Sequence, residues 1–175
     1  VPMGGVTTLL DVGGGTGLYS YSLLQANPTL RAVIVELPEV VRIAEEFARE
    51  KGLLDRVEII EGDMFRIDDL PAAQMVLFSN ILHDWDEPEC RELTARYAAK
   101  LPSGGRMLIH DVFLNDTMDG PLPIALYSSA LFSVTEGRAY SAAEYRAMLN
   151  AAGLITDGQI VNTLVHCAVL TGTKP

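Results

Sequence analysis

The alternation of apolar, strand-like runs with helical segments most constrains how this chain can fold. Strand-like runs are expected at 7–13, 31–37, 56–63, 74–82 and 106–113. Helices are expected between and after them, at 18–27, 38–52, 87–101 and 141–153. Nearly unbroken apolar strands that alternate with helices are typical of a parallel sheet covered by helices on both faces.

The last part of the chain departs from this alternation. Segments 154–161 and 165–172 follow each other without a helix between them and predict a closing pair of strands. The segment 114–137 is expected to be irregular. We therefore predict an α/β fold, with a Rossmann-like, mostly parallel seven-stranded sheet, helices on both faces and an antiparallel C-terminal strand.

Composition limits the class of protein and its partners. The chain has 175 residues, 49% of them hydrophobic, so we expect one domain over 1–175 with a sizeable core. A formal net charge of −10 argues against nucleic acid and anionic membrane surfaces as partners. There is no apolar run of membrane-spanning length and no signal-peptide pattern. Because Cys90 and Cys167 suggest no disulfide framework, we expect a reduced, cytoplasmic setting.

A glycine-rich turn, "LLDVGGGTGL", follows the first expected strand. The dinucleotide fingerprint G-x-G-x-x-G fails, because counting from Gly13 places Leu18 where the third glycine belongs. The phosphate-binding P-loop also fails, because no Gly-Lys-Ser/Thr follows. The turn predicts close approach of a ligand without a phosphate signature, although a tight strand-to-helix turn would also explain its glycines.

Acidic residues stand at the ends of the next two strands. Ligands of an open parallel sheet bind beyond the carboxyl ends of its strands. Glu36 could accept both ribose hydroxyls, while Asp63 could accept an adenine amine and Met64 could pack on the ring. Each acid, taken alone, could equally be a solvated turn residue. Together, and without Lys or Arg for a phosphate, they predict a cationic adenosine cofactor, S-adenosylmethionine.

Several motifs of the chain stand in the order found in one family. The chain resembles the catalytic domain of the class I S-adenosylmethionine-dependent methyltransferases, and more narrowly the small-molecule O-methyltransferases of caffeate, acetylserotonin and bacterial antibiotic pathways. The motifs that carry the resemblance are "LLDVGGGTG", "VELPEVV", "EGDMF", "ILHDWDEPEC" and "EYRAMLNAAGL". The resemblance covers essentially the whole chain and implies methyl transfer to a hydroxyl of a small, aromatic metabolite.

The resemblance also implies roles for individual residues. The expected cofactor-binding residues are Asp11, Gly13, Gly15, Glu36, Leu37, Asp63, Met64, Ser79 and Asn80. His83 falls on the family's general base, and Asp111 on an acid that orients it. Relatives carry Glu at that position, so the shorter Asp111 predicts a looser contact. A second acid is expected where Ala139 stands, and Glu136 is an alternative for its role.

The chemistry of histidine supports the base role independently. Imidazole, with a pKa of about 6.5, is mostly neutral near pH 7 and can take the proton of a phenol whose pKa is about 10. A lone histidine is more often structural, but His83 lies at a strand end among polar residues. We interpret His110 and His166 as structural. No metal is predicted, because no His–acid pair has a known ligand spacing.

The segment 114–137 is predicted to line the substrate pocket. The expected substrate-binding residues are Trp85, Met118, Tyr127 and Leu131. Helix core is the alternative, because positions 127, 131 and 134 have helical spacing.

Assembly and activity leave alternatives open. The resemblance implies a homodimer built by an N-terminal region that is expected to be absent here, so dimerisation of this chain is in doubt and an exposed apolar patch is expected. The absent region and Ala139 favour an alternative function, a cofactor-binding domain that has lost or changed methyl transfer. An NAD-dependent oxidoreductase is disfavoured by Leu18.

Overall fold

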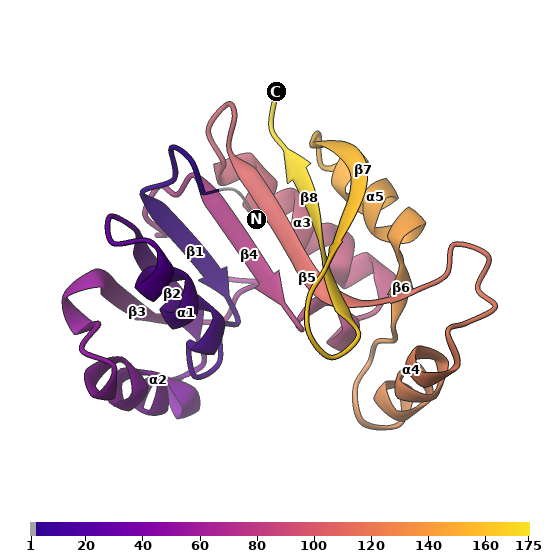
Figure 1. The fold of residues 1–175 in the computed structure, drawn as a ribbon, viewed down its shortest axis with the longest axis horizontal. Coiled ribbons are helices and arrows are strands. Elements are labelled where there is room, and N and C mark those ends of the chain that lie inside the picture. The colour runs from indigo at the N-terminus through magenta and orange to yellow at the C-terminus, as the bar shows by residue number, and fades with distance from the viewer. Residues whose placement is uncertain (1–2) are drawn as a thin grey trace.

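A computed structural model describes residues 3–175. Its main sheet has the strand order β3-β2-β1-β4-β5-β8-β7, as Figure 1 shows. These strands are β1 (Thr8–Val12), β2 (Arg31–Glu36), β3 (Val57–Glu61), β4 (Met75–Ser79), β5 (Arg106–Leu114), β7 (Ile155–Asn162) and β8 (Cys167–Thr173). The helices are α1 (Leu18–Ala26), α2 (Pro38–Glu50), α3 (Glu87–Lys100), α4 (Leu122–Val134) and α5 (Ala142–Ala151). Two 3-10 helices, η1 (Leu54–Arg56) and η2 (Leu82–Asp84), precede β3 and α3.

The pairing of the strands confirms the predicted fold class. Strands β1 to β5 pair in parallel, and β8 runs antiparallel to both β5 and β7. A further two-residue strand, β6 (Tyr140–Ser141), pairs with the end of β5 and was not expected from the sequence. Strand order reverses between β1 and β4, which is where an open α/β sheet binds its ligands.

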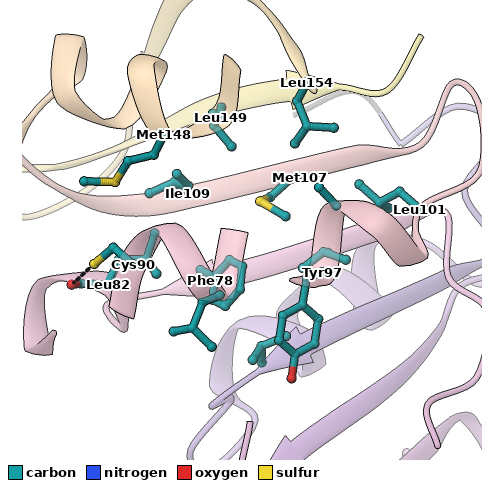
Figure 2. Packing of buried hydrophobic residues seen from close by; sticks show 14 of the residues in the cluster. Phe78, Leu82, Cys90, Tyr97, Leu101, Met107, Ile109, Met148, Leu149 and Leu154 are labelled. Atoms are coloured by element: carbon teal, nitrogen blue, oxygen red, sulfur yellow. Dashed lines mark hydrogen bonds between the residues drawn. The ribbon is translucent and has the colours of Figure 1, made fainter. Parts of the chain in front are cut away.

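Alternate residues of the strands face two separate cores. Leu9, Ile34 and Leu77 pack on one face with residues of α1 and α2. The other face of the sheet packs against α3 and α5, where Figure 2 shows Phe78, Tyr97 and Met107 among the buried side chains. Burial on both faces explains why the strands are apolar at nearly every position.

Local sequence signals fix the helix starts near the strand ends. Asp86 accepts a hydrogen bond from the Glu87 N–H at the start of α3, and the Ser141 and Glu144 side chains form a capping box on α5. The α3 cap follows η2 directly, so the turn between β4 and α3 is held at both ends. None of the helices in residues 3–175 is long and apolar enough to cross a membrane.

The structure corrects two predictions. The segment 114–137 is not irregular throughout, because α4 occupies its second half and lies beyond the ends of β5 and β6 (Figure 1). Apolar residues are spread around α4, so no single face marks it in the sequence; Leu131 is buried, whereas Leu126 and Phe132 are exposed. His166 is also not a structural strand residue, since it lies exposed in the turn between β7 and β8.

Candidate cofactor and catalytic site

The glycine-rich turn packs tightly against β1, which precedes it, and β2, which follows it. Gly13 has a φ of +66°, a conformation that favours glycine. A Cβ atom on Gly14 would lie 2.8 Å from Cγ of Asp11 and from a methyl carbon of Ile34. The bare backbone is therefore required by packing, whether or not a ligand approaches it.

A cleft of about 340 Å³ opens beside this turn, at the carboxyl ends of β1 and β2. Its lining residues are Gly13, Val35, Glu36, Leu37, Gly62, Asp63, Met64, Phe65, Ile81, Asp84 and Trp85. Of the nine predicted cofactor-binding residues, the cleft brings together Gly13, Glu36, Leu37, Asp63 and Met64. The lining holds three carboxyl groups and no Lys or Arg, so it suits a cation better than a phosphate.

Backbone N–H groups fix two of these acids. The Glu36 carboxylate accepts hydrogen bonds from the N–H of Gly15 at 2.8 Å and of Leu37 at 2.7 Å. Asp63 accepts a hydrogen bond from the N–H of Phe65 at 2.9 Å. Each carboxylate oxygen keeps a second lone pair, so both acids can still accept hydrogen bonds from a ligand.

Asp11 lies beneath the turn rather than in the cleft. Its side chain is 1% exposed, one carboxyl oxygen accepts a 2.6 Å hydrogen bond from the Ser20 hydroxyl, and the other has no partner in the described part of the chain. Burial raises the pKa of Asp11 to about 6, against the lowering effect of Ser20 and with a further increase from the charge of Glu36. Asp11 was expected among the cofactor-binding residues, but its side chain packs beneath the turn and does not line the cleft.

Ser79 and Asn80 also lie outside the cleft. The Ser79 hydroxyl is 2.8 Å from Nδ1 of His110, whose Nε2 is 3.0 Å from the Thr163 hydroxyl. Asn80 contacts the Tyr19 hydroxyl at 3.4 Å. His110 thus links the end of β4 to Thr163, just after β7, in a partly buried polar network, which agrees with its structural interpretation.

His83 lies in η2, immediately after β4, and is nearly buried. Its Nδ1 is 2.5 Å from Oδ1 of Asp111, which is 1% exposed. Asp111 also accepts hydrogen bonds from the Val112 N–H at 2.8 Å and the Tyr145 hydroxyl at 3.1 Å. The prediction of a looser contact is wrong, because the β4–β5 pairing brings the end of β5 so close to η2 that the shorter acid reaches His83.

The other ring nitrogen of His83, Nε2, lies between a hydroxyl and a second carboxylate. Its Nε2 is 3.4 Å from the Tyr127 hydroxyl and 3.6 Å from Oδ1 of Asp84. Burial lowers the pKa of His83, but the hydrogen bond and charge of Asp111 and the charge of Asp84 together raise it above its ordinary value. Since an ionised carboxylate only accepts hydrogen bonds, Nδ1 carries the proton and Nε2 of neutral His83 is free to take another.

Neither predicted position brings a second acid against His83 in residues 3–175. Ala139 is fully buried with Val112 and Ile124, and Glu136 is exposed, with its backbone N–H bonded to the Asp84 carbonyl at 3.2 Å. The second carboxylate beside His83 is Asp84, its neighbour in the sequence. The "HDW" stretch contains this acid, but sequence reasoning looked for it far along the chain.

The segment around Gly137 holds the His83 turn from outside. A Cβ atom on Gly137 would collide with backbone atoms of His83, Asp84 and Trp85. From the other side, the Cys90 thiol donates to the Leu82 carbonyl at 3.1 Å (Figure 2). Neither contact was predicted from the sequence. A glycine shortly before the capping box of α5 is the one local feature that could have drawn attention to Gly137.

Comparison with known proteins places this geometry in a family. The family model described as an O-methyltransferase domain matches residues 1–155. The chain belongs to this O-methyltransferase family.

Relatives of this O-methyltransferase domain are longer than the chain. The 3-hydroxy-5-methyl-1-naphthoate 3-O-methyltransferase of Streptomyces sahachiroi is 39% identical over 154 residues, which are 87% of this chain and 44% of the relative. The crystal structure of an O-methyltransferase family 2 protein from Planctomyces limnophilus, complexed with apigenin, matches with a TM-score of 0.92 and 49% identity, covering 96% of this chain and 51% of that one. This chain thus spans about half the length of the relatives it matches.

Other matches bear on the cofactor and on the acceptor atom. The crystal structure of human N-acetylserotonin methyltransferase in complex with S-adenosylmethionine matches with a TM-score of 0.89 and 26% identity, covering 99% of this chain and 49% of that one. Relatives named as carbon and nitrogen methyltransferases also match. The names of these relatives all specify methyl transfer, and many of them specify oxygen as the acceptor atom.

The residues of this O-methyltransferase domain fit S-adenosylmethionine. The cleft has the size of a small-molecule site, and its acids and apolar side chains suit a cationic ligand with an aromatic base. In residues 3–175 no group of three His, Cys, Asp or Glu side chains could hold a metal ion.

The predicted substrate-binding residues are not all brought together. Trp85 lines the cleft and packs edge-on against Phe65, with ring centroids 4.7 Å apart. Tyr127 lies against His83. Met118 is 52% exposed on the loop before α4, whereas Leu131 is buried, and neither lines the cleft.

A second, larger pocket lies at the end of β5. It has a volume of about 630 Å³ and lies between the end of β5, the start of α4 and the β7–β8 hairpin. Its walls include Phe113, Pro121, Ile124, Arg146 and Cys167. None of the four predicted substrate-binding residues lines it.

Proposed function

We propose that this chain is the catalytic part of an S-adenosylmethionine-dependent O-methyltransferase that acts on a hydroxyl of a small, aromatic metabolite. The observation that carries the proposal is the His83–Asp111 pair, which engages Nδ1 and leaves Nε2 as the nitrogen that can accept a proton, at the sheet edge that also forms the acidic cleft. Family membership supports the reaction class.

The acids of the cleft would hold the cofactor. Glu36 would accept the ribose hydroxyls, and Asp63 and Met64 would bind the adenine. The backbone of Gly13 and Gly15 would approach the rest of the molecule. Bound S-adenosylmethionine would supply an electrophilic methyl group on a sulfonium.

Three further predicted cofactor-binding residues would act indirectly. Asp11 supports the glycine turn from below, and Ser79 and Asn80 hold the end of β4 through contacts with His110 and Tyr19. Their substitution would therefore affect the cofactor through the shape of the cleft.

His83 would act as the general base. Its Nδ1–H donates to Asp111, which keeps the Nε2 lone pair available and stabilises the imidazolium once Nε2 takes the acceptor proton. Base catalysis of this kind contributes about 10²–10⁴-fold in rate. Because Asp111 and Asp84 raise the pKa of His83, activity should rise with pH through that elevated pKa, as neutral His83 becomes available.

We infer an aromatic acceptor from the side chains near His83 and from the names of similar proteins. Trp85 and Tyr127 offer aromatic surface near His83, and Met118 and Leu131 remain predictions for the substrate side. The names of two similar proteins include a naphthoate substrate and bound apigenin, both flat aromatic molecules. A cytoplasmic location likewise remains a prediction, as does a homodimer of full-length relatives that this chain by itself is not expected to form readily.

A second candidate is a domain with lost or changed methyl transfer. The observations that favour it are Ala139 in place of the expected acid and the matches to carbon and nitrogen methyltransferases.

Transfer of labelled methyl from S-adenosylmethionine to a panel of phenols, aromatic amines and carbon acceptors tests both candidates. We expect label on phenols and a fall of about 10²-fold or more in kcat/KM for His83→Ala. The control is Gln25→Ala, which changes an exposed side chain near the end of α1 that lines neither pocket. Label on amines or carbon alone, or a fully active His83→Ala variant, would contradict the proposed function.

A further inference from the structure

We propose that Tyr127 is a second catalytic residue, whose hydroxyl donates a hydrogen bond to the acceptor oxygen while His83 removes its proton. This inference rests on the proposed function and names a residue that positions and stabilises the acceptor in the same site.

The position of the Tyr127 hydroxyl follows from which nitrogen of His83 is available. Asp111 occupies Nδ1, so an acceptor proton can reach only Nε2. The Tyr127 hydroxyl is 3.4 Å from Nε2, and the two rings meet edge-on with centroids 5.6 Å apart. An oxygen about 2.8 Å from each atom closes a triangle over this separation, so one acceptor oxygen can lie within hydrogen-bond distance of both Nε2 and the Tyr127 hydroxyl.

The surroundings of Tyr127 keep it a proton donor. Burial, together with the negative charges of Asp111 and Asp84 and the nearby Cys167, raises its pKa above its ordinary value. The charged and titratable groups that face it come from η2 (His83, Asp84), β5 (Asp111) and β8 (Cys167). Tyr127 therefore keeps its proton near pH 7 and competes with His83 neither as a base nor as a phenolate.

Tyr127 also has room to move. It is 41% exposed and lies on α4, beyond the strand ends. With no acceptor bound, its hydroxyl can donate to Nε2 and fill the place of the acceptor hydroxyl. When an acceptor arrives, a small swing of the ring transfers that hydrogen bond from Nε2 to the acceptor oxygen.

The bond changes leave Tyr127 unaltered. The oxygen–hydrogen bond of the acceptor breaks, its proton goes to Nε2 of His83, and the freed electron pair on oxygen forms the new bond to the methyl carbon as the methyl–sulfur bond breaks. The Tyr127 hydrogen bond strengthens while negative charge develops on that oxygen. The benefit is greatest for acceptors whose hydroxyl is least acidic.

Tyr127→Phe keeps the ring and removes only the hydroxyl. We expect its kcat/KM to fall about 10-fold or more for phenols with a pKa of about 10, and about 2-fold or less for nitrophenols that are largely ionised at the assay pH. The matched control is Ser129→Ala, which removes an exposed hydroxyl of α4 that bonds only within the helix. An equal fall for all phenols would indicate a structural role, and either that or no fall would overturn the inference.

An NMR titration of the His83 ring in the ligand-free protein gives a readout that does not depend on activity. A donor to Nε2 stabilises neutral imidazole, so Tyr127→Phe should raise the pKa of His83 further and Ser129→Ala should not. An unchanged or lower pKa overturns the inference. If the parent protein methylates the phenols and Tyr127→Phe equals it in both kcat/KM and the pKa of His83, only this inference fails. If the parent protein methylates none of the phenols, the proposed function fails as well.

Discussion

Replacing Asp11 with Asn should stabilise the protein more at high pH than at low pH. Asp11 is fully buried, and one of its carboxyl oxygens has no hydrogen-bond partner among residues 3–175. Burial raises its pKa from 3.8 to about 6. A folded-state pKa above the unfolded value means that the ionised form is disfavoured by folding. The resulting destabilisation is absent below the unfolded value of 3.8, grows as pH rises towards 6 and is complete above it.

The size of the effect follows from the shift in pKa. At about 1.36 kcal/mol per pKa unit, ionised Asp11 lowers the free energy of unfolding by about 3 kcal/mol near pH 8 and by about half of that near pH 5. An Asn side chain does not titrate and can still accept the Ser20 hydrogen bond, although one polar group stays unpartnered at a cost of about 1–3 kcal/mol. That cost is the same at both pH values, so it cancels when the two measurements are compared.

The assay is urea unfolding of the parent and of Asp11→Asn at about pH 5 and about pH 8. We expect the stability of the variant relative to the parent to increase by about 1.5 kcal/mol between the two pH values. Asp69→Asn, at an exposed acid, is the control and should show no such increase. A difference between variant and parent that does not change with pH, or that changes in the opposite direction, would refute the reasoning about burial of this carboxyl group.

Two further predictions concern the support of His83. Asp111→Asn keeps an oxygen for His83 but removes the charge, so the midpoint of the pH–rate profile should move to lower pH and kcat/KM should fall about 10–100-fold; an unmoved midpoint would contradict the role of that charge. Gly137→Ala places a methyl group against the backbone of the His83 turn and should lower the free energy of unfolding, measured in urea, by about 1–3 kcal/mol. The control is Gly4→Ala rather than a change at Gly153, whose φ is positive: a Cβ at Gly4 meets no described residue within 4 Å, and the free energy of unfolding should stay unchanged. Equal free energies of unfolding for these two variants would show that the His83 turn accommodates the methyl group without cost, and would contradict the prediction.

The sequence by itself determined the layered sheet and the main parts of the site. Strand and helix periodicity, the capping signals and the unbroken apolar strands are local properties, and the observed strands and most helices lie within a few residues of their predicted ranges. The acids of the cleft were predictable because the ends of parallel strands meet at one edge of the sheet. The pairing of His83 with Asp111 was expected from the family resemblance, and the structure brings the two together.

Only the tertiary structure decided which way each side chain faces and what fills the space around it. Asp11 and Glu36 both belong to strand ends, yet one points into the core beneath the glycine turn and the other into the cleft. Tyr127, Tyr145 and Gly137 meet the His83–Asp111 pair from segments far along the chain. Those contacts depend on how α4, α5 and β5 pack together. The local sequence pattern fixes the existence of an element, whereas side-chain neighbours across the sheet are set by the packing of all elements at once.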